Sequence, residues 1–255
     1  MKKSLNPLKQ QGLINEYGEL NTEIKSKMTA AEYISACIKE EVEEYSEDEL
    51  DIYADVPDNF VNNCNRVTIR TNKYASKLIN SGFDVTILTR TDFVNVINSG
   101  DKTKIMCSEG TILNSGDECI IGGLNKHIVD SGIATEIVSV RDSASIICTG
   151  YNPMILSTGD SADIICNGNV AYVNSEGKDA KIVCNGYACT VKAKLGSTIT
   201  LSECRRTKEG EFCYRKTEVV DGVRIKEDKW YQLRGNEFVE TIPGQNDEIC
   251  CDEED

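Results

Sequence analysis

The sequence predicts a mainly β fold: a two-sheet β-solenoid similar to a β-roll, with 18 residues per coil, an N-terminal helix and a small C-terminal antiparallel β cap. Three segments show the repeat most clearly: DSASIIC at 142–148, SADIIC at 161–166 and DAKIVC at 179–184. An aliphatic residue recurs every nine residues through most of the segment 67–201, so two nonapeptides make one coil. These central residues, here called anchors, are Ile69, Leu78, Ile87, Val96, Ile105, Ile112, Ile121, Ile128, Ile137, Ile146, Ile155, Ile164, Val173, Ile182 and Val191. The spacing falls to seven after Ile105 and after Ile121, which predicts two shortened turns.

The N-terminal segment 1–66 is expected to be an arm that carries an acidic amphipathic helix. Glu32 follows Thr29 by three residues, which is typical of a capping box at the start of a helix. Apolar residues keep rough helical spacing over 29–45, which is the predicted helix. The acidic run at 40–51 is interpreted as a solvated helix end and linker, with a docking surface for a basic partner as the alternative.

Each coil is expected to contain two short strands joined by turns. Strand side chains alternate between faces, so the residues two positions before and after an anchor point inward with it. In the later repeats these residues are mostly small, such as Ala144 and Cys148 around Ile146, which predicts a thin solenoid. Turn signals that contain Gly lie between the strands, as in NSGD at 98–101. The fifteen anchors correspond to seven to eight coils.

The repeats are not expected to bind calcium. Calcium-binding nonapeptide rolls carry an aspartate two residues before the anchor. None of the fifteen corresponding residues is acidic. Burial and backbone hydrogen bonds are therefore expected to hold the coils together.

One sheet is predicted to carry an outward row of aliphatic residues, here called the aliphatic stripe. The residue after each anchor points outward, and in one sheet this residue is always apolar. The stripe consists of Ile79, Ile97, Leu113, Val129, Ile147, Ile165 and Val183. On the opposite sheet the same position is mixed, with charged residues such as Arg70 and Lys192. Apolar patches of this kind mark contacts, and three occupants are open: the helix at 29–45, a second copy of the chain, or a partner protein.

The segment 202–248 is expected to form a β cap, because the nine-residue period fails there. Short β-prone runs separated by turns that contain Gly predict antiparallel strands. Repeat stacks need capping at their ends, and Trp230, Tyr231 and Phe238 would supply a small core. The acidic tail 249–255 is expected to be disordered.

Charge is distributed unevenly along the chain, whose formal net charge is −14. Residues 1–66 carry 7 basic and 14 acidic side chains, residues 67–201 carry 12 and 13, and residues 202–255 carry 9 and 15. The solenoid segment is therefore almost neutral, which argues against direct binding to nucleic acid.

No apolar run approaches the roughly 18 residues of a membrane span, and the first residues do not resemble a signal peptide. We expect a cytoplasmic protein without a membrane partner.

No residue pattern indicates catalysis. The twelve cysteines are expected to be free, because many fall on repeat positions and no export signal is visible. Cys107, Cys148, Cys166 and Cys184 occupy inward positions, so we expect packing thiols with raised pKa values. His127 is the only histidine and has no evident partner nearby in the sequence. We predict no catalytic, cofactor or metal site; an enzyme acting on a glycan is the least favoured alternative.

Four runs near the C-terminus carry a resemblance to other proteins. They are GSTITLSE at 196–203, VDG at 220–222, IKEDKWYQL at 225–233 and EFVE at 237–240. This ending resembles that of uncharacterised proteins encoded by bacterial phages and prophages, which also carry Ser-Gly-Asp/Asn nonapeptide repeats. The resemblance covers about residues 67–242. This sequence differs from those proteins in its cysteine-rich inward positions and in its N-terminal arm. It implies a phage or prophage context and supplies no catalytic residues.

These patterns together favour a non-enzymatic scaffold that binds protein in the cytoplasm of a bacterial host. The expected partner is a host protein or complex. The leading hypothesis is an inhibitor of a bacterial defence complex, of the anti-CRISPR or anti-restriction type. The alternative is a virion or fibre component whose solenoid forms homo-oligomers along the aliphatic stripe.

Overall fold

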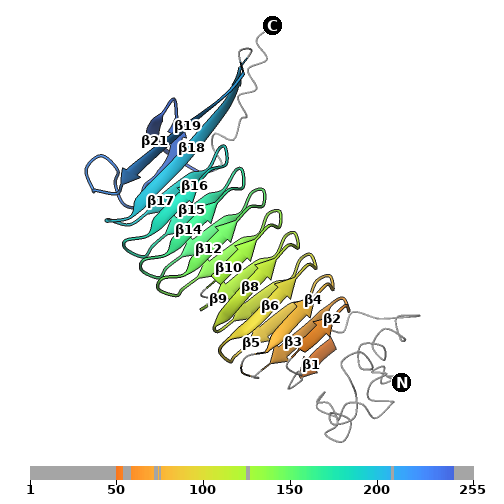
Figure 1. The fold of residues 1–255 in the computed structure, drawn as a ribbon. Helices are drawn as coiled ribbons and strands as arrows, with labels where there is room; N and C mark the ends of the chain where they lie inside the picture. Colours follow the sequence, from red (N-terminus) through yellow and green to blue (C-terminus); the bar gives the residue numbers. More distant parts are fainter. Residues whose placement is uncertain are drawn as a thin grey trace, which may run out of the picture. The chain divides into compact units, whose positions relative to one another are not determined.

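The structure is a computed structural model that describes residues 50–53, 59–71, 74, 76–124, 127–207 and 210–243 (Figure 1). These residues form strands, turns and bends, with no helix among them. The chain divides into two compact units between Asn125 and Lys126.

The first unit is a two-sheet solenoid whose strands alternate between the sheets. One sheet contains β1 (Leu50–Tyr53), β3 (Val67–Thr71), β5 (Thr86–Thr89), β7 (Lys104–Cys107) and β9 (Ile120–Gly123), all parallel. The other, which we call the stripe sheet, contains β2 (Asn59–Asn62), β4 (Lys77–Asn80), β6 (Val94–Asn98) and β8 (Gly110–Asn114), also parallel. The register joins Leu78 to Val96, one 18-residue coil apart, and Ile105 to Ile121, only 16 apart. The predicted shortened turn after Ile105 is therefore confirmed.

The second unit continues the same coil pattern and ends in two antiparallel hairpins. Its stripe sheet contains, in parallel, β10 (His127–Asp130), β12 (Ser145–Cys148), β14 (Asp163–Cys166), β16 (Lys181–Cys184) and the start of β18 (Thr198–Thr207). The opposite sheet contains β11 (Glu136–Ser139), β13 (Met154–Ser157), β15 (Tyr172–Ser175) and β17 (Thr190–Ala193). β18 pairs with β19 (Gly210–Val219), while β20 (Trp230–Arg234) joins β17 and pairs with β21 (Glu237–Thr241). Each hairpin thus continues one sheet of the solenoid.

The anchors form the core of both units, as predicted. All fifteen are at most 1% exposed. Phe60, nine residues before Ile69, is 3% exposed and occupies one further anchor position. Because each anchor sits on the anchor of the next coil, burial of the row removes apolar surface from water along the whole stack.

The turns bring the backbones of neighbouring coils close together. A Cβ atom on Gly100 would lie 1.9 Å from the carbonyl oxygen of Gly82, so only glycine fits there. Non-glycine residues with positive φ, such as Lys102 at 54°, form the corners. The Lys102 N–H donates to the carbonyl of Asp117 on the next coil at 2.8 Å. These inter-coil hydrogen bonds offset the cost of the left-handed conformation, which is about 1–2 kcal/mol per residue.

The inward position two residues after the stripe-sheet anchor differs between the units. In the first unit it holds Asn62, Asn80, Asn98 and Asn114, which we call the asparagine ladder; all four are buried. The Nδ2 of each of the first three donates to the Oδ1 of the next, at 2.7, 2.7 and 2.6 Å. The second unit places other residues there, and all four of them are 0% exposed: Asp130, Cys148, Cys166 and Cys184.

The predicted fold class is wrong in its N-terminal part. It assigned a helix at 29–45 and an arm up to residue 66, whereas the described residues contain no helix, and β1 and β2 pair with β3 and β4. These strands form because the edges of β3 and β4 offer backbone N–H and C=O groups that need partners. The segment 29–45 itself and the tail 249–255 lie outside the described residues. The structure supports a mainly β, two-sheet solenoid with antiparallel pairing at its C-terminal end.

Candidate interaction surfaces

In the first unit the aliphatic stripe follows the outer face of the stripe sheet. Ile79, Ile97 and Leu113 are register partners on β4, β6 and β8. Val61 on β2 pairs with Ile79 and extends the stripe by one coil. Leu113 is 41% exposed, while the other three are half-buried. The aliphatic repeat does not reveal Val61, because its anchor is the aromatic Phe60.

In the second unit the stripe lies on four adjacent strands of the sheet, β10, β12, β14 and β16. Val129 pairs with Ile147, Ile147 with Ile165, and Ile165 with Val183. Val129 is 39% exposed and the other three are half-buried. Val183 then pairs with Thr200 of β18. Thr200 is 7% exposed and its hydroxyl lies 2.9 Å from that of Thr217, so a hydroxyl pair ends the aliphatic row.

Polar columns flank the stripe on both sides. The residue two positions after each stripe member is a serine, threonine or asparagine: Ser81, Ser99, Ser115, Ser131, Thr149, Asn167 and Asn185. The hydroxyl groups donate to the preceding coil, as Ser99 does to the Asn80 carbonyl at 3.3 Å. The column on the other side is Lys77, Asn95, Thr111, His127, Ser145, Asp163 and Lys181. A partner on the stripe would therefore meet an apolar centre with polar margins.

The opposite sheet is less polar than its sequence pattern suggests. In the second unit, Met154 is 54% exposed and Val140, just after β11, is 45% exposed. In the first unit, Met106 and Ile120 are 41% and 37% exposed. The stripe is therefore the most regular apolar row, but Met154 on the opposite sheet is more exposed than any stripe residue.

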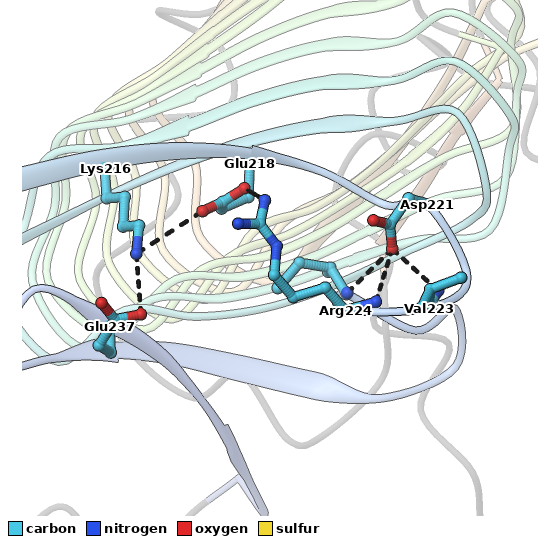
Figure 2. Close-up of polar contacts among 7 residues, drawn as sticks. Lys216, Glu218, Asp221, Val223, Arg224 and Glu237 are labelled. Carbon is cyan, nitrogen blue, oxygen red and sulfur yellow. Dashed lines mark hydrogen bonds and ion pairs between the residues drawn. The ribbon is translucent and has the colours of Figure 1, made fainter.

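Charged residues gather where the two C-terminal hairpins meet (Figure 2). Glu218 of β19 is 8% exposed and forms ion pairs with Lys216, at 3.7 Å, and with Arg224. Lys216 also pairs with Glu237 of β21 at 2.8 Å. Since each carboxylate faces a cation, the cluster is electrically balanced and links β19 to β21. Its role in the fold is to hold the two hairpins together.

Asp221 organises the turn beside this cluster. Its Oδ1 accepts N–H groups from Val223, Arg224 and Ile225 at 2.9, 2.8 and 3.1 Å. These backbone donors, led by Val223 and Ile225, lower the pKa of the Asp221 carboxyl. All three donors come from the loop that follows Asp221, so this carboxylate acts as a local turn former (Figure 2).

The four cysteines that were expected to be packing thiols are buried. Cys107, Cys148, Cys166 and Cys184 are at most 2% exposed and free. Burial raises the pKa of Cys107, and contact with the Cys166 thiol together with burial raises those of Cys148 and Cys184, as predicted. The prediction is wrong for Cys166: hydrogen bonds from the thiols on the neighbouring coils lower its pKa to about 4. All four sulfur atoms lie in the core, where no substrate reaches them.

His127 and Cys213 lie outside the core. His127 is exposed on the outer face of β10. Cys213 is disulfide-bonded, contrary to the expectation of free thiols, and the register of β18 and β19 places it opposite Cys204. Within the described part of the chain, no group of three His, Cys, Asp or Glu residues could hold a metal ion. The described residues contain no helix that is long and apolar enough to cross a membrane.

Comparisons with protein-family models, with curated proteins and with solved structures found no significant match.

Proposed function

We propose that this protein is a non-enzymatic protein-binding scaffold and that the aliphatic stripe of its second unit contacts the partner. The observation that carries the proposal is the in-register row of Val129, Ile147, Ile165 and Val183 on adjacent strands. The partner chemistry that fits it is an apolar strip with polar margins, because the row lies between two polar columns. A side chain that is half-buried in the free protein loses little further conformational entropy on binding, which favours contact at such a row.

The size of the row sets a requirement on the partner. Adjacent strands are about 4.8 Å apart, so four stripe residues span roughly 14 Å. A specific interface buries about 800 Å² on each partner, which a single row of this length does not supply. The partner must therefore also contact the polar columns that contain Thr149 and Asp163, and hydrogen bonds there would select it.

The phage resemblance of the C-terminal runs supports a particular class of partner. A phage or prophage protein acting in the bacterial cytoplasm meets host defence complexes, and a binding surface suffices to block one. We therefore propose a protein component of a bacterial defence complex, of the anti-CRISPR or anti-restriction type, as the partner.

The test compares two double variants that leave the anchors in place. Ile147→Lys/Ile165→Lys puts two charges on the stripe, and Val138→Lys/Leu156→Lys puts two on the opposite sheet of the same coils, where both residues are also half-buried. Each variant is expressed in strains that carry one defined defence system, and the plating efficiency of a sensitive phage is measured. Affinity for the purified complex from the responding strain is then determined.

The wild-type chain is expected to restore plating in at least one strain. The stripe variant should lose that effect, with affinity weakened by about a hundredfold, while the opposite-sheet variant keeps it. Restoration by the stripe variant at wild-type level would overturn the assignment of the stripe. No restoration by the wild-type chain in any strain would count against the defence inhibitor.

A further inference from the structure

β19 is a long strand with one unpaired edge. It pairs with β18 along its whole length, from Thr198 opposite Val219 to Thr207 opposite Gly210. β18 in turn pairs with β16 only through its first four residues, up to Leu201. The remainder of the hairpin extends past β16 as a two-stranded ribbon (Figure 1). Among the described strands, β19 has no neighbour other than β18.

Such a ribbon is poorly stabilised by itself. A two-stranded hairpin is only marginally stable in water, because it has no third strand to pack against. Its free edge also presents backbone N–H and C=O groups that can pair with another strand. Edge strands often block this pairing with charged side chains, especially lysine, or with proline. The free part of β19 contains neither lysine nor proline: it reads GEFCYR at 210–215, with one acidic and one basic residue.

The sequence of this edge is self-complementary in the antiparallel direction. Consider two identical antiparallel strands related by a two-fold axis normal to the sheet. Residues that lie opposite each other point to the same face, so their numbers are both odd or both even, and the two numbers add to an even value. The register centred on Cys213 places Glu211 opposite Arg215 of the second copy, and it does so twice. The same register places Phe212 opposite Tyr214, also twice. Opposite charges and aromatic pairs in these positions stabilise neighbouring strands.

Other symmetric registers lack this match. Centring on Arg215 puts two arginines opposite each other, and centring on Glu211 puts two glutamates together. Centring on Thr217 would pair Lys216 with Glu218, but Glu218 is buried at the hairpin junction and already has cationic partners. Cys213 is disulfide-bonded, so the central pair stays non-covalent.

We propose that two copies of this chain associate edge to edge through β19, in the antiparallel register centred on Cys213, to form a continuous sheet across the dimer. This interface uses β19 at 210–215 and leaves the aliphatic stripe free. It is therefore independent of the proposed partner surface, and a dimer would present two stripes to a partner.

The test uses charge reversal at the two matched positions. Glu211→Arg makes both positions basic, and Arg215→Glu makes both acidic, so each single variant faces only like charges across the dimer axis. The two variants mixed together have opposite charges at every contact. The molar mass of each sample is measured by size-exclusion chromatography with light scattering, and the dissociation constant by sedimentation equilibrium.

The wild-type chain is expected to be a dimer, and each single variant should dissociate at least about tenfold more easily. The equimolar mixture should return to the dimer mass. A change within one hairpin cannot explain that recovery. Within each chain, position 211 lies opposite Arg206 and position 215 lies opposite Ser202, and mixing the two variants does not alter these neighbours. A monomeric wild-type protein, single variants as dimeric as the wild type, or a mixture that stays monomeric would each overturn the proposal.

The stripe variant Ile147→Lys/Ile165→Lys is the control that separates the two surfaces. It should keep the wild-type dimer mass although it loses the partner. Loss of the dimer in this variant would place the self-contact on the stripe and contradict the β19 interface.

Discussion

The coils of 59–124 and those of 127–193 share one backbone pattern but fill their inward polar positions in different ways. In the first set the asparagine ladder joins each coil to the next, and the Thr89 hydroxyl donates to the Cys107 sulfur at 3.0 Å. In the second set the ladder position holds mostly cysteine. On the opposite sheet of the second set, Ser139, Ser157 and Ser175 are buried, and their hydroxyl groups have no hydrogen-bond partner among the described residues.

This difference shows which interactions every coil needs. Buried anchors, inter-coil backbone hydrogen bonds and close glycine turns occur in both sets, so they define the coil. The inward polar side chains vary, so they adjust the stability of a coil without defining it. A connected amide ladder also favours one register, because a shift leaves buried donors and acceptors unpaired. Stacked thiols impose a weaker version of the same constraint.

The largest expected effect concerns the turns that both sets share. Gly100→Ala and Gly186→Ala would each place a Cβ within 2.0 Å of a backbone carbonyl oxygen of the neighbouring coil. Each should reduce the free energy of unfolding by more than about 3 kcal/mol, because a backbone cannot yield as a side chain can. Urea unfolding monitored by circular dichroism measures this loss. Gly235→Ala is the control: its φ is +57° but its Cβ would meet no atom within 4 Å, so about 1–2 kcal/mol is expected. A mild effect at Gly186 alone would show that the two sets differ in their backbones as well.

The next largest effect compares the stability that the asparagine ladder and the stacked thiols contribute. Asn98 donates to Gly100 and Asn114 and accepts from Asn80, so Asn98→Ala leaves buried polar groups unpaired. It should reduce the free energy of unfolding by about 3 kcal/mol. Cys166→Ala removes a packed sulfur atom and its weak hydrogen bonds with the thiols of Cys148 and Cys184, and it should cost roughly 1 kcal/mol. Urea unfolding of the two variants gives both values. Equal losses would mean that the ladder contributes no more than packing.

The smallest effect is the loss of one inward hydroxyl group, which should change the free energy of unfolding in opposite directions in the two sets of coils. Ser157→Ala removes a buried hydroxyl that has no hydrogen-bond partner among the described residues, so it should leave the free energy of unfolding unchanged or raise it by up to about 1 kcal/mol. Thr89→Val removes a hydroxyl that donates to Cys107, and it should lower stability by about 1 kcal/mol. Thermal unfolding followed by calorimetry resolves the sign. A clear loss in Ser157→Ala would show that the serine hydroxyl is paired, for example with buried water.

The coils could be predicted because their signals are local and periodic. Every anchor from Ile69 to Val191 follows from spacing, and so does the outward direction of the stripe. The first coil could not be predicted in the same way. Ile52 pairs with Ile69 at a separation of 17 residues, which departs from the repeat. Pairing with β3 and β4 places this segment in the sheets, and pairing between segments leaves no local pattern.

The candidate surfaces were predicted less completely than the coils. Alternation shows which side chains point outward, but exposure depends on how the side chains one coil away cover them. For this reason Leu113 and Val129 are exposed while Ile147 is half-buried, although all three occupy the same position. The exposed Met154 on the opposite sheet escapes prediction for the same reason.

The amino-acid sequence alone determines the coil length, the anchors, the shortened turn after Ile105 and the direction of the stripe, because a period of nine with alternating faces leaves one way to bury the aliphatic residues. The tertiary structure decides that β1 and β2 belong to the two sheets, how the hairpins end these sheets, and which stripe residues are accessible. It also places β19 at the edge of its sheet, with no second neighbour among the described strands. These properties depend on contacts between segments that are distant in sequence, and such contacts have no period to reveal them.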